Sequence, residues 1–373
     1  MARFTVTYWL GAQDEPEARA RALELAAEQT VEIPRDIVPA GYVEDEILGQ
    51  LVGLECNGDS RGGYLATISY SDDDVGEDFL QLLNIVFGNS SMKTQTRVET
   101  LTLSDGIRSL CRGPKHGTSG IRRCTGVPAG PIMLSAVKPV GLSTAALAAL
   151  AHQFALGGMN LIKDDHGLVN QPASRFQDRV KACVDAVNDA NAKTGLGSAF
   201  VPNITCSAAA LLDRARLAQE LGAGAVMVAP ALLGFDAVRT LAADPDFHLP
   251  ILSHPSFAGT NVITPTTGFS HHFFFGLLQR LMGVDSVIFP NFGGRFGFSR
   301  EECLAIKDGC TAVFGDYKPV LPACGGGMSL ERIPDMRATY GRDVIYLIGG
   351  ALLRDKGDLV GACQRLVDAV RAA

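Results

Sequence analysis

A strand–helix pattern that repeats eight times from Pro131 onward constrains the fold of this 373-residue chain more than any other feature. The apolar runs are Ile132–Lys138, Met159–Asp165, Ser198–Thr205, Ala225–Pro230, Pro250–His254, Ser286–Asn291, Val320–Cys324 and Val344–Gly350. The helical segments that follow are 143–156, 174–193, 207–221, 234–243, 270–282, 299–308, 330–339 and 358–371. Eight such units predict a (β/α)8 TIM barrel. An open doubly wound sheet would carry a GxGxxG fingerprint after its first strand, which this sequence lacks.

The preceding segment predicts a smaller α+β domain. Its strands and helices are expected at Phe4–Leu10, Pro16–Glu28, Leu48–Cys56, Tyr64–Tyr70, Gly76–Val86 and Thr96–Leu103. The order strand, helix, strand, strand, helix, strand is typical of a ferredoxin-like fold. The glycines and prolines of Gly113–Gly130 indicate a linker. We therefore predict an N-terminal domain at 1–125 and a barrel domain at 126–373.

The composition excludes several classes of function. The formal net charge is -7 and no block of basic residues occurs, so the sequence predicts no nucleic-acid partner. No apolar run approaches the length of a membrane span, and the first residues lack an apolar signal core, which predicts a cytoplasmic protein away from membranes. The nine cysteines form no CxxC pair, as expected for reduced thiols.

The stretch Met159–Gly167 changes from apolar to polar at the end of the second predicted barrel strand. Because side chains alternate along a strand, Lys163 and Asp165 are expected on one face and Asp164 on the other. His166 follows directly, where the backbone can turn it back toward the same face. These residue types at a strand end favour a functional site, although a solvated loop with a surface ion pair fits this stretch equally well.

Polar residues and glycines also lie at the ends of the other barrel strands, where barrel enzymes carry their catalytic groups. These positions are Lys138, Asn203, His254, Asn291, Cys324 with Gly325–Gly327, and Gly349–Gly350. The glycine-rich ends of the last two strands let backbone N–H groups approach an anion, and phosphate binding is usual there. Simple tight turns are the alternative. The pattern predicts a phosphorylated small-molecule substrate, with Asn291 as a candidate substrate-binding residue.

Two of these motifs resemble those of a known family. Val137–Ser143 is similar to the strand-one lysine motif of the ribulose-bisphosphate carboxylase large subunit, and Asn160–His166 is similar to its metal-site motif. His254 falls at the strand-five histidine of the family. Gly326, Gly327, Gly349 and Gly350 fall on its phosphate loops. The resemblance covers nearly the whole chain and is greatest to the non-carboxylating RuBisCO-like proteins, also called form IV.

The resemblance implies a metal site and an acid/base. Lys163 would react with CO2 to form a carbamate, which together with Asp165 would bind Mg²⁺. Lys138 would be the general acid/base or enolate stabiliser, with a structural ion pair as the alternative. His166 stands where carboxylating members have a third carboxylate ligand. This change implies a weakened Mg²⁺ site, a softer ion such as Mn²⁺ or Zn²⁺, or a role for His166 as a proton shuttle.

Other departures from the family argue against carboxylation. The carboxylating members have a second lysine at the position of Val140, a strand-six histidine at that of Asn291 and a lid lysine at that of Phe298. The arginine that follows the strand-five histidine in the family is replaced by Pro255, and a further histidine nearby is replaced by Ala258. We therefore expect no CO2 fixation and a monophosphate substrate.

Three further residues have candidate roles. Arg295 would partly replace the lost positive charge, unless it is an ordinary surface arginine. Cys324 precedes a glycine turn and would transfer protons in an isomerase, unless it is a buried inert thiol. Glu28 lies in Ala27–Thr30, which is similar to the segment that enters a neighbouring subunit's barrel. With Asn84–Asn89 it predicts a homodimer with shared active sites, whereas an ordinary helix-end charge is the alternative.

The combined reading predicts an isomerase or enolase that removes a proton next to the carbonyl of a ketose monophosphate. The substrates typical of the resembled branch are 5-methylthioribulose 1-phosphate-type compounds of methionine salvage. Two alternatives keep the fold. One is a decarboxylase or carbon–carbon hydrolase acting on a 3-oxo sugar-acid phosphate, and the other is a non-catalytic sugar-phosphate sensor.

Overall fold

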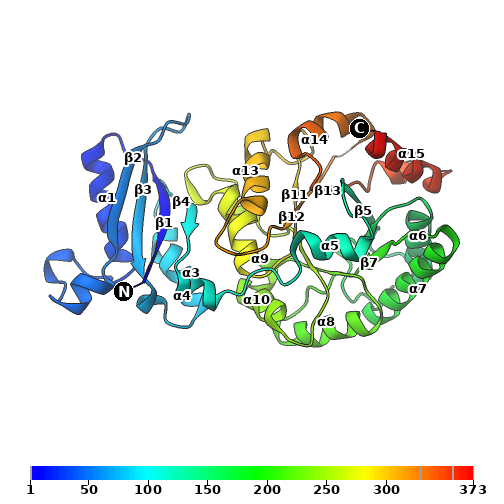
Figure 1. Ribbon diagram of the computed structural model, residues 1–373, viewed down its shortest axis with the longest axis horizontal. Helices are drawn as coiled ribbons and strands as arrows, with labels where there is room; N and C mark the ends of the chain where they lie inside the picture. Colours follow the sequence, from blue (N-terminus) through cyan, green and yellow to red (C-terminus); the bar gives the residue numbers. More distant parts are fainter. Residues whose placement is uncertain (1, 328, 355–356, 373) are drawn as a thin grey trace. The chain divides into compact units, whose positions relative to one another are not determined.

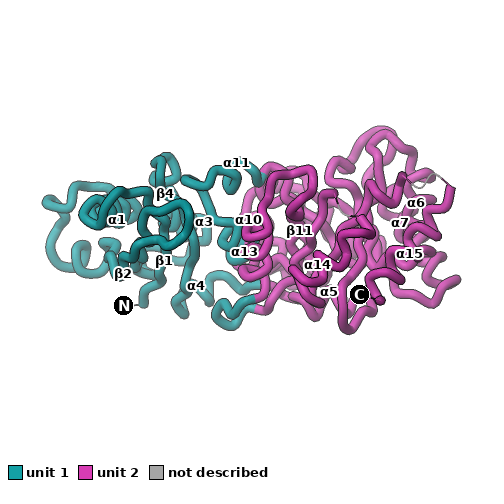
Figure 2. Tube along the Cα trace, turned by 90° about the horizontal axis from the view of Figure 1, so that it is seen from above, with its two compact units in different colours: residues 1–113, 258–278, 312–317 teal, residues 114–257, 279–311, 318–373 magenta. Residues whose placement is uncertain are grey.

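The computed structural model describes residues 2–327, 329–354 and 357–372. The chain forms two compact units, which Figure 2 colours separately. Unit 1 comprises residues 1–113, 258–278 and 312–317, and unit 2 comprises residues 114–257, 279–311 and 318–373. Each unit therefore draws on segments that are far apart in the sequence. The domain boundary predicted at residue 125 stays a prediction.

Unit 1 contains the predicted ferredoxin-like arrangement. Its strands are β1 (Arg3–Leu10), β2 (Gln50–Cys56), β3 (Tyr64–Ser71), β4 (Thr96–Thr102) and β10 (Thr267–Phe269). Its α-helices are α1 (Glu15–Glu28), α2 (Asp72–Val75), α3 (Phe79–Phe87), α4 (Asp105–Leu110) and α11 (Gly259–Val262). The sheet order is β10-β4-β1-β3-β2, and the pairs β1–β3, β1–β4 and β2–β3 are antiparallel (Figure 1). Helix α1 begins at Asp14, whose side chain accepts a hydrogen bond from the Glu17 N–H.

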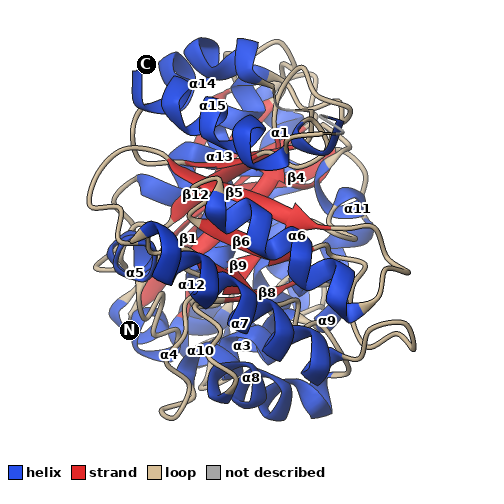
Figure 3. Cartoon of the chain, turned by 90° about the vertical axis from the view of Figure 1, so that its right-hand side faces the viewer, coloured by secondary structure: helices blue, strands red, loops and turns tan. Residues whose placement is uncertain are grey.

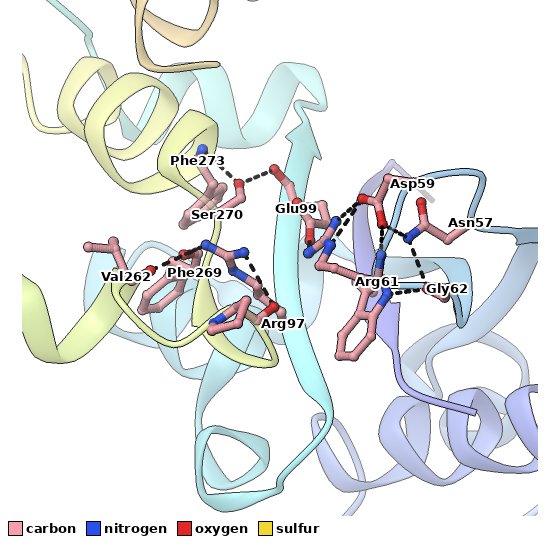
Figure 4. Close-up of polar contacts among 12 residues, drawn as sticks. Asn57, Asp59, Arg61, Gly62, Arg97, Glu99, Val262, Phe269, Ser270 and Phe273 are labelled. Atoms are coloured by element: carbon pink, nitrogen blue, oxygen red, sulfur yellow. Dashed lines mark hydrogen bonds and ion pairs between the residues drawn. The ribbon is translucent and has the colours of Figure 1, made fainter. Parts of the chain in front are cut away.

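Strand β10 was not predicted from the sequence. It comes from the segment between two barrel strands and pairs parallel with β4, because Arg97 of β4 binds three carbonyl groups of that segment. Its guanidinium donates to the carbonyl oxygens of Phe269 at 3.0 Å and of Val262 at 3.4 Å, as Figure 4 shows. Ser270 adds a hydrogen bond of 2.8 Å to the Glu99 carbonyl oxygen. Strand β10 has only three residues and is stabilised mainly by contacts with β4, so its own sequence shows no recognisable strand pattern.

Unit 2 is the predicted barrel. Its strands are β5 (Ile132–Val137), β6 (Leu161–Asp164), β7 (Ala199–Val201), β8 (Val226–Val228), β9 (Ile251–Ser253), β11 (Ser286–Pro290), β12 (Leu321–Gly325) and β13 (Ile345–Leu347). They pair parallel in the order β7-β6-β5-β13-β12-β11-β9-β8. A bridge between Asn203 and Met227 closes the remaining gap between β7 and β8. All eight predicted strands are therefore present.

Most helices of unit 2 lie outside the strands (Figure 1 and Figure 3). They are α6 (Thr144–Leu156), α7 (Phe176–Thr194), α8 (Leu211–Glu220), α9 (Pro230–Leu233), α10 (Phe235–Ala243), α13 (Arg300–Thr311), α14 (Ile333–Tyr340) and α15 (Leu359–Ala372). Helix α5 (Gly117–Thr125) instead reaches the interior core, and the sequence of α12 (Leu278–Leu281) is divided between the two units. Alternate strand residues pack into one interior core that includes Leu134, Leu161 and Ala323. This alternation fixes which strand residues face the barrel interior.

The Gly113–Gly130 stretch is not only a linker, and this expectation is corrected. It contains α5, whose Ile121 is fully buried in the interior core. Asp285 accepts hydrogen bonds from the backbone N–H groups of His116 and Ile251, both at 2.9 Å, and burial raises the pKa of this carboxyl to about 6. The many glycines of this stretch hid the helix from sequence analysis. Tertiary contacts, and not local helix propensity, stabilise α5.

Among the described residues, we find no helix with both the length and the apolar character that a bilayer crossing requires.

Candidate active site

Strand alternation brings the predicted polar residues to the mouth of the barrel. Lys163 lies two residues after the interior residue Leu161, so its side chain faces inward, and it is 2% exposed. By the same parity, Lys138 follows the interior positions of β5 and His254 follows that of β9. Asp165 comes directly after β6. The carboxyl-terminal ends of parallel strands share one side of a barrel, so these four residues lie at the same end of the barrel.

Asp164 faces the opposite way and forms a buried ion pair with Arg179 of α7. The guanidinium donates from Nε at 3.0 Å and from Nη2 at 3.2 Å to the two carboxylate oxygens, and both side chains are fully buried. The Asn203 N–H donates to the same carboxylate at 3.0 Å. The predicted separation of Asp164 from Lys163 is confirmed. The pair fixes the end of β6 to the surrounding helix and to β7.

Asn203 also holds the loop that carries His166. Its amide Nδ2 donates to the carbonyl oxygens of His166 at 2.9 Å and of Leu168 at 3.1 Å. Its backbone N–H is already bound to Asp164. One side chain therefore connects the buried ion pair to the polar loop at the mouth.

Burial makes Lys163 unusually easy to deprotonate. Desolvation lowers its pKa to about 8, against the opposing charges of Asp165 and Asp164, and the charge of Lys138 lowers it further. Its ammonium group donates a hydrogen bond of 3.0 Å to the Asp164 carbonyl oxygen. A substantial neutral fraction near physiological pH makes this amine a nucleophile.

Asp165 remains ionised at the edge of the site. Partial burial acts to raise its pKa, but the interaction with His166 and the charges of Lys163 and Lys138 outweigh burial and lower the pKa to about 2. The distance from its Oδ1 to Nδ1 of His166 is 3.6 Å. The effect of Lys138 on the pKa values of both Lys163 and Asp165 places its charge in the same mouth.

His254 and His166 stack on one another, with ring centroids 4.5 Å apart and planes inclined by 14°. Nδ1 of His254 accepts a hydrogen bond from the Ser256 N–H at 3.2 Å, which assigns the proton of the neutral ring to Nε2. Burial, together with the charges of Lys163 and His166, lowers the pKa of His254 to about 2. His254 is therefore a neutral hydrogen-bond donor and not a cation.

The glycine turns after β12 and β13 surround the same mouth. Gly326 and Gly327 have φ values of +85° and +89°, which favour glycine. A Cβ atom on Gly294 would lie 1.9 Å from the Gly326 carbonyl oxygen, so only glycine allows the 292–298 loop to pack against this turn. A Cβ atom on Gly349 would lie 3.5 Å from Nζ of Lys138, which places that ammonium group beside the second turn. Gly350 follows in open space.

Two predicted site residues face away from the mouth. Ala323 and Ile288 point into the barrel interior, so Cys324 and Asn291 point toward the helices. Cys324 is fully buried and burial raises the pKa of its thiol well above the usual range, which opposes a role in proton transfer. Asn291 is also fully buried, and its Oδ1 accepts a hydrogen bond from the Tyr340 hydroxyl. The geometry therefore does not support the catalytic role predicted for Cys324 or the substrate-binding role predicted for Asn291.

The 292–298 loop contains a predicted arginine and is held by one that the sequence did not single out. Arg295 is exposed and lies over the ring of Phe296, with 4.9 Å from its guanidinium carbon to the ring centroid. Arg332, at the start of α14, donates from Nη2 to the Phe292 carbonyl oxygen at 2.6 Å. Arg332 and Arg179 were not predicted from the sequence, because the partner of each is far away in the sequence and no local motif indicates the contact.

Glu28 lies at the end of α1 in unit 1. Its Oε1 accepts a hydrogen bond of 3.2 Å from Nδ2 of Asn89. The buried Gln29 beside it donates to the carbonyl oxygens of Asn84 and Ile85 at 2.9 and 2.8 Å. The two segments predicted to reach a partner subunit therefore lie side by side in this unit.

Comparison with known proteins agrees with this geometry. The family described as ribulose bisphosphate carboxylase large chain, catalytic domain, matches residues 117–364. A protein of Rhodospirillum rubrum named 5-methylthioribulose-1-phosphate isomerase is 36% identical over 358 residues, covering 95% of this chain and 92% of its own. A protein of Bacillus velezensis named 2,3-diketo-5-methylthiopentyl-1-phosphate enolase is 31% identical over 385 residues, covering 100% and 94%. The crystal structure of a RuBisCO-like protein from Rhodopseudomonas palustris superimposes with a TM-score of 0.87 at 34% identity, covering 100% of this chain and 98% of that one.

The fold and the polar mouth define a barrel enzyme of the isomerase or enolase type. The chain belongs to the ribulose-bisphosphate carboxylase large-chain family, within its RuBisCO-like branch. The resemblance predicted from the sequence motifs is thereby confirmed.

Family membership implies Mg²⁺ bound with the help of a carbamylated lysine, and the donor set of this mouth fits such an ion. Among the described residues, no group of three or more His, Cys, Asp or Glu side chains is arranged to bind a metal. In the arrangement that the family implies, Lys163 would contribute an oxygen ligand as its carbamate, beside the ionised Asp165. Two anionic oxygen groups suit a hard divalent cation, and His166 adjoins them with a nitrogen instead of a third carboxylate.

We expect Arg179→Ala to lower the free energy of unfolding by about 3–5 kcal/mol, because it leaves the Asp164 carboxylate buried without its counter-ion. Urea unfolding followed by circular dichroism measures the change. Lys181→Ala is the matched control on the same helix, since it removes only an exposed pair with Asp185 and should cost less than about 1 kcal/mol. Equal costs for the two variants would contradict the role given to the buried pair.

We expect carbamate formation on Lys163 to increase as pH rises through about 8 at constant dissolved CO2. Only the neutral amine reacts, and the lowered pKa places its deprotonation there, well below that of an ordinary lysine. ¹³C NMR with labelled CO2 measures the signal, which Lys163→Met should abolish. Lys138→Met should shift the midpoint to higher pH, because the charge of Lys138 lowers the pKa of Lys163. Absence of a Lys163-dependent signal at alkaline pH would refute this prediction.

Proposed function

We propose that this enzyme removes a proton next to the carbonyl group of a ketose monophosphate of the 5-methylthioribulose 1-phosphate type and returns it at a neighbouring carbon, as an isomerase of methionine salvage. The observation that carries the proposal is the gathering of Lys138, Lys163 and Asp165 at one barrel mouth, with Lys138 beside the Gly349 turn. The isomerase name of the relative at 36% identity supports this substrate class.

The chain's own residues divide the work as follows. The turns at Gly326–Gly327 and Gly349–Gly350 bind the phosphate through backbone N–H groups, which orients the sugar carbons toward the mouth. Nζ of Lys138, beside Gly349, exchanges the proton with the substrate carbon. Nε2–H of the neutral His254 donates a hydrogen bond to a substrate oxygen. Lys163 as its carbamate, Asp165 and His166 would hold Mg²⁺, which would supply acidification of the C–H next to the carbonyl.

The Arg179–Asp164–Asn203 network serves this chemistry indirectly. It fixes Lys163 and the His166 loop before substrate arrives, so little reorganisation is needed during the reaction. Val140 and Phe298 stand in place of two lysines of the carboxylating members, which supports proton transfer without CO2 fixation.

A second candidate is the enolase reaction named for the relative at 31% identity. It begins with the same proton abstraction and differs in the substrate, a 2,3-diketone phosphate. The observation that favours it is the coverage of that match, 100% of this chain.

We expect 5-methylthioribulose 1-phosphate to take up deuterium from D2O in the presence of the enzyme, with Mg²⁺ and bicarbonate. Lys138→Met should reduce the exchange rate by about 10²–10⁴-fold, because it removes the acid/base group. ¹H NMR follows the exchange. Lys181→Met, on the outer face of α7, is the matched control and should leave the rate unchanged.

The diketone phosphate is the parallel substrate, and its turnover in place of the ketose would select the enolase reaction. Exchange that is equally fast in the Lys138→Met variant would refute the role of this lysine. Absence of exchange with both substrates would refute the proposed function.

We also propose that the enzyme is a homodimer in which Glu28 of one subunit completes the site of the other. The pairing of Glu28 with Asn89 supports this, because it joins the two segments expected to reach the partner. Glu28→Gln and Lys138→Met should each be inactive alone. Mixed after mild unfolding and refolding, they should regain about a quarter of wild-type activity, since half of the dimers then contain one intact site.

The control mixes Lys138→Met with Asp165→Asn. Each of these changes damages the barrel mouth of the subunit that carries it. Every barrel in the mixture is therefore defective, and no combination of subunits restores a site. Recovery in this control, or none in the first mixture, would contradict shared sites.

A further inference from the structure

A cavity of about 210 Å³ lies at the end of the barrel opposite the mouth. Met133, at the start of β5, and Asn160, directly before β6, form part of its wall. Strand β5 separates these residues from Lys138, which lies beyond its other end. The cavity is therefore distinct from the candidate active site.

Three arginines line this cavity: Arg337 of α14, Arg342 of the turn that follows it, and Arg371 of α15. Within residues 2–327, 329–354 and 357–372, their side chains make no hydrogen bond or ion pair. Two other arginines of this unit are paired with acids, since Arg122 binds Asp343 at 2.5 Å and Arg216 binds Asp244 at 2.7 Å. Arg337 is half-buried, whereas Arg342 and Arg371 are exposed, so the three guanidinium groups line a cavity that is open to solvent.

The remaining lining contributes no opposing charge. None of the described residues of the wall is acidic. Asp343, next to Arg342 in sequence, is already bound to Arg122. Asp368 lies on α15 three residues before Arg371 and is not part of the wall. Among the described residues, no acid therefore forms an ion pair with the three arginines of the cavity.

Neutral groups of the wall add polar and apolar contacts. Oδ1 of Asn160 accepts a hydrogen bond from the Met133 N–H at 2.8 Å, while its Nδ2 donors have no partner among the described residues. Met133, Val367 and Val370 supply apolar surface. Amide and guanidinium donors around a small apolar pocket are the groups that bind phosphates and carboxylates.

We propose that this cavity is a second binding site, specific for a small anion that carries at least two negative charges. Its volume is below the ~300–1,000 Å³ typical of pockets for larger ligands, which favours a pyrophosphate-sized molecule over a nucleotide. The described residues of the wall include no lysine, histidine, cysteine or acid that would act as a nucleophile or proton carrier. The site therefore binds its ligand without transforming it.

Isothermal titration calorimetry of the intact protein with pyrophosphate tests the proposal. We expect Arg337→Gln and Arg342→Gln each to weaken pyrophosphate binding at this cavity by about tenfold or more, because each removes a charged hydrogen-bond donor. Arg123→Gln is the matched control, since it makes the same charge change on α5 outside the cavity. Lys138→Met should leave this binding unchanged, which separates it from anion binding at the mouth.

A parallel titration with citrate distinguishes the two anion chemistries. Binding of both probes supports a general dianion site, and binding of pyrophosphate alone supports a phosphate site. Arg371→Gln provides a third substitution, at an exposed position of the cavity wall. The unfolding temperature of each variant without ligand shows whether the substitution destabilises the protein. Equal affinity in the Arg337→Gln, Arg342→Gln and Arg123→Gln proteins, or loss of all binding in Lys138→Met, would overturn the proposal.

Discussion

The buried ion pair between Asp164 and Arg179 is the interaction on which the candidate site depends. Removing two charges from water is costly, so a fully buried pair is retained only where its geometry is well satisfied. Here both carboxylate oxygens accept from the guanidinium, and the Asn203 N–H adds a third hydrogen bond. The pair thereby fixes the end of β6, and strand geometry then directs the next residue on each side of Asp164 into the mouth.

The electrostatics of the mouth follow from that placement. Lys163 is buried near a second lysine and two carboxylates, and burial dominates, so its pKa falls to about 8. Partial burial acts to raise the pKa of Asp165, but the hydrogen bond with His166 and the neighbouring positive charges outweigh it, so its pKa falls to about 2. His254 remains neutral because burial and nearby cations act in the same direction. Similar neighbours thus give each group a different protonation behaviour according to its burial.

The chain path shows how the two units share their sequence. Residues 258–278 leave the barrel sequence after His254 and its Ser256 partner, and they contribute β10 to the sheet of unit 1. Arg97 binds this segment through three carbonyl groups. Strand β9 and His254 are therefore followed in the sequence by a segment that pairs with the sheet of unit 1. Division of the molecule into units does not follow a single cut in the sequence.

Much of the fold could be predicted from the sequence because strand and helix periodicities are local. The eight barrel strands and the order of the N-terminal elements were expected, and alternation correctly assigned Lys163 and Asp164 to opposite faces. The lysine and metal-type motifs indicated the family, because functional residues there are close together in sequence.

Only the tertiary structure decided which strand-end residues face the mouth. Cys324 and Asn291 lie at strand ends like Lys138, but each is an odd number of residues from an interior position of its strand. Each side chain therefore points toward the helices. The partners that hold the site, Arg179, Asn203 and Arg332, also required the fold, as did helix α5 and strand β10. The physical reason is the range of the interactions: periodicity records contacts between residues a few positions apart, whereas burial, ion pairing and pKa values depend on groups that folding brings together.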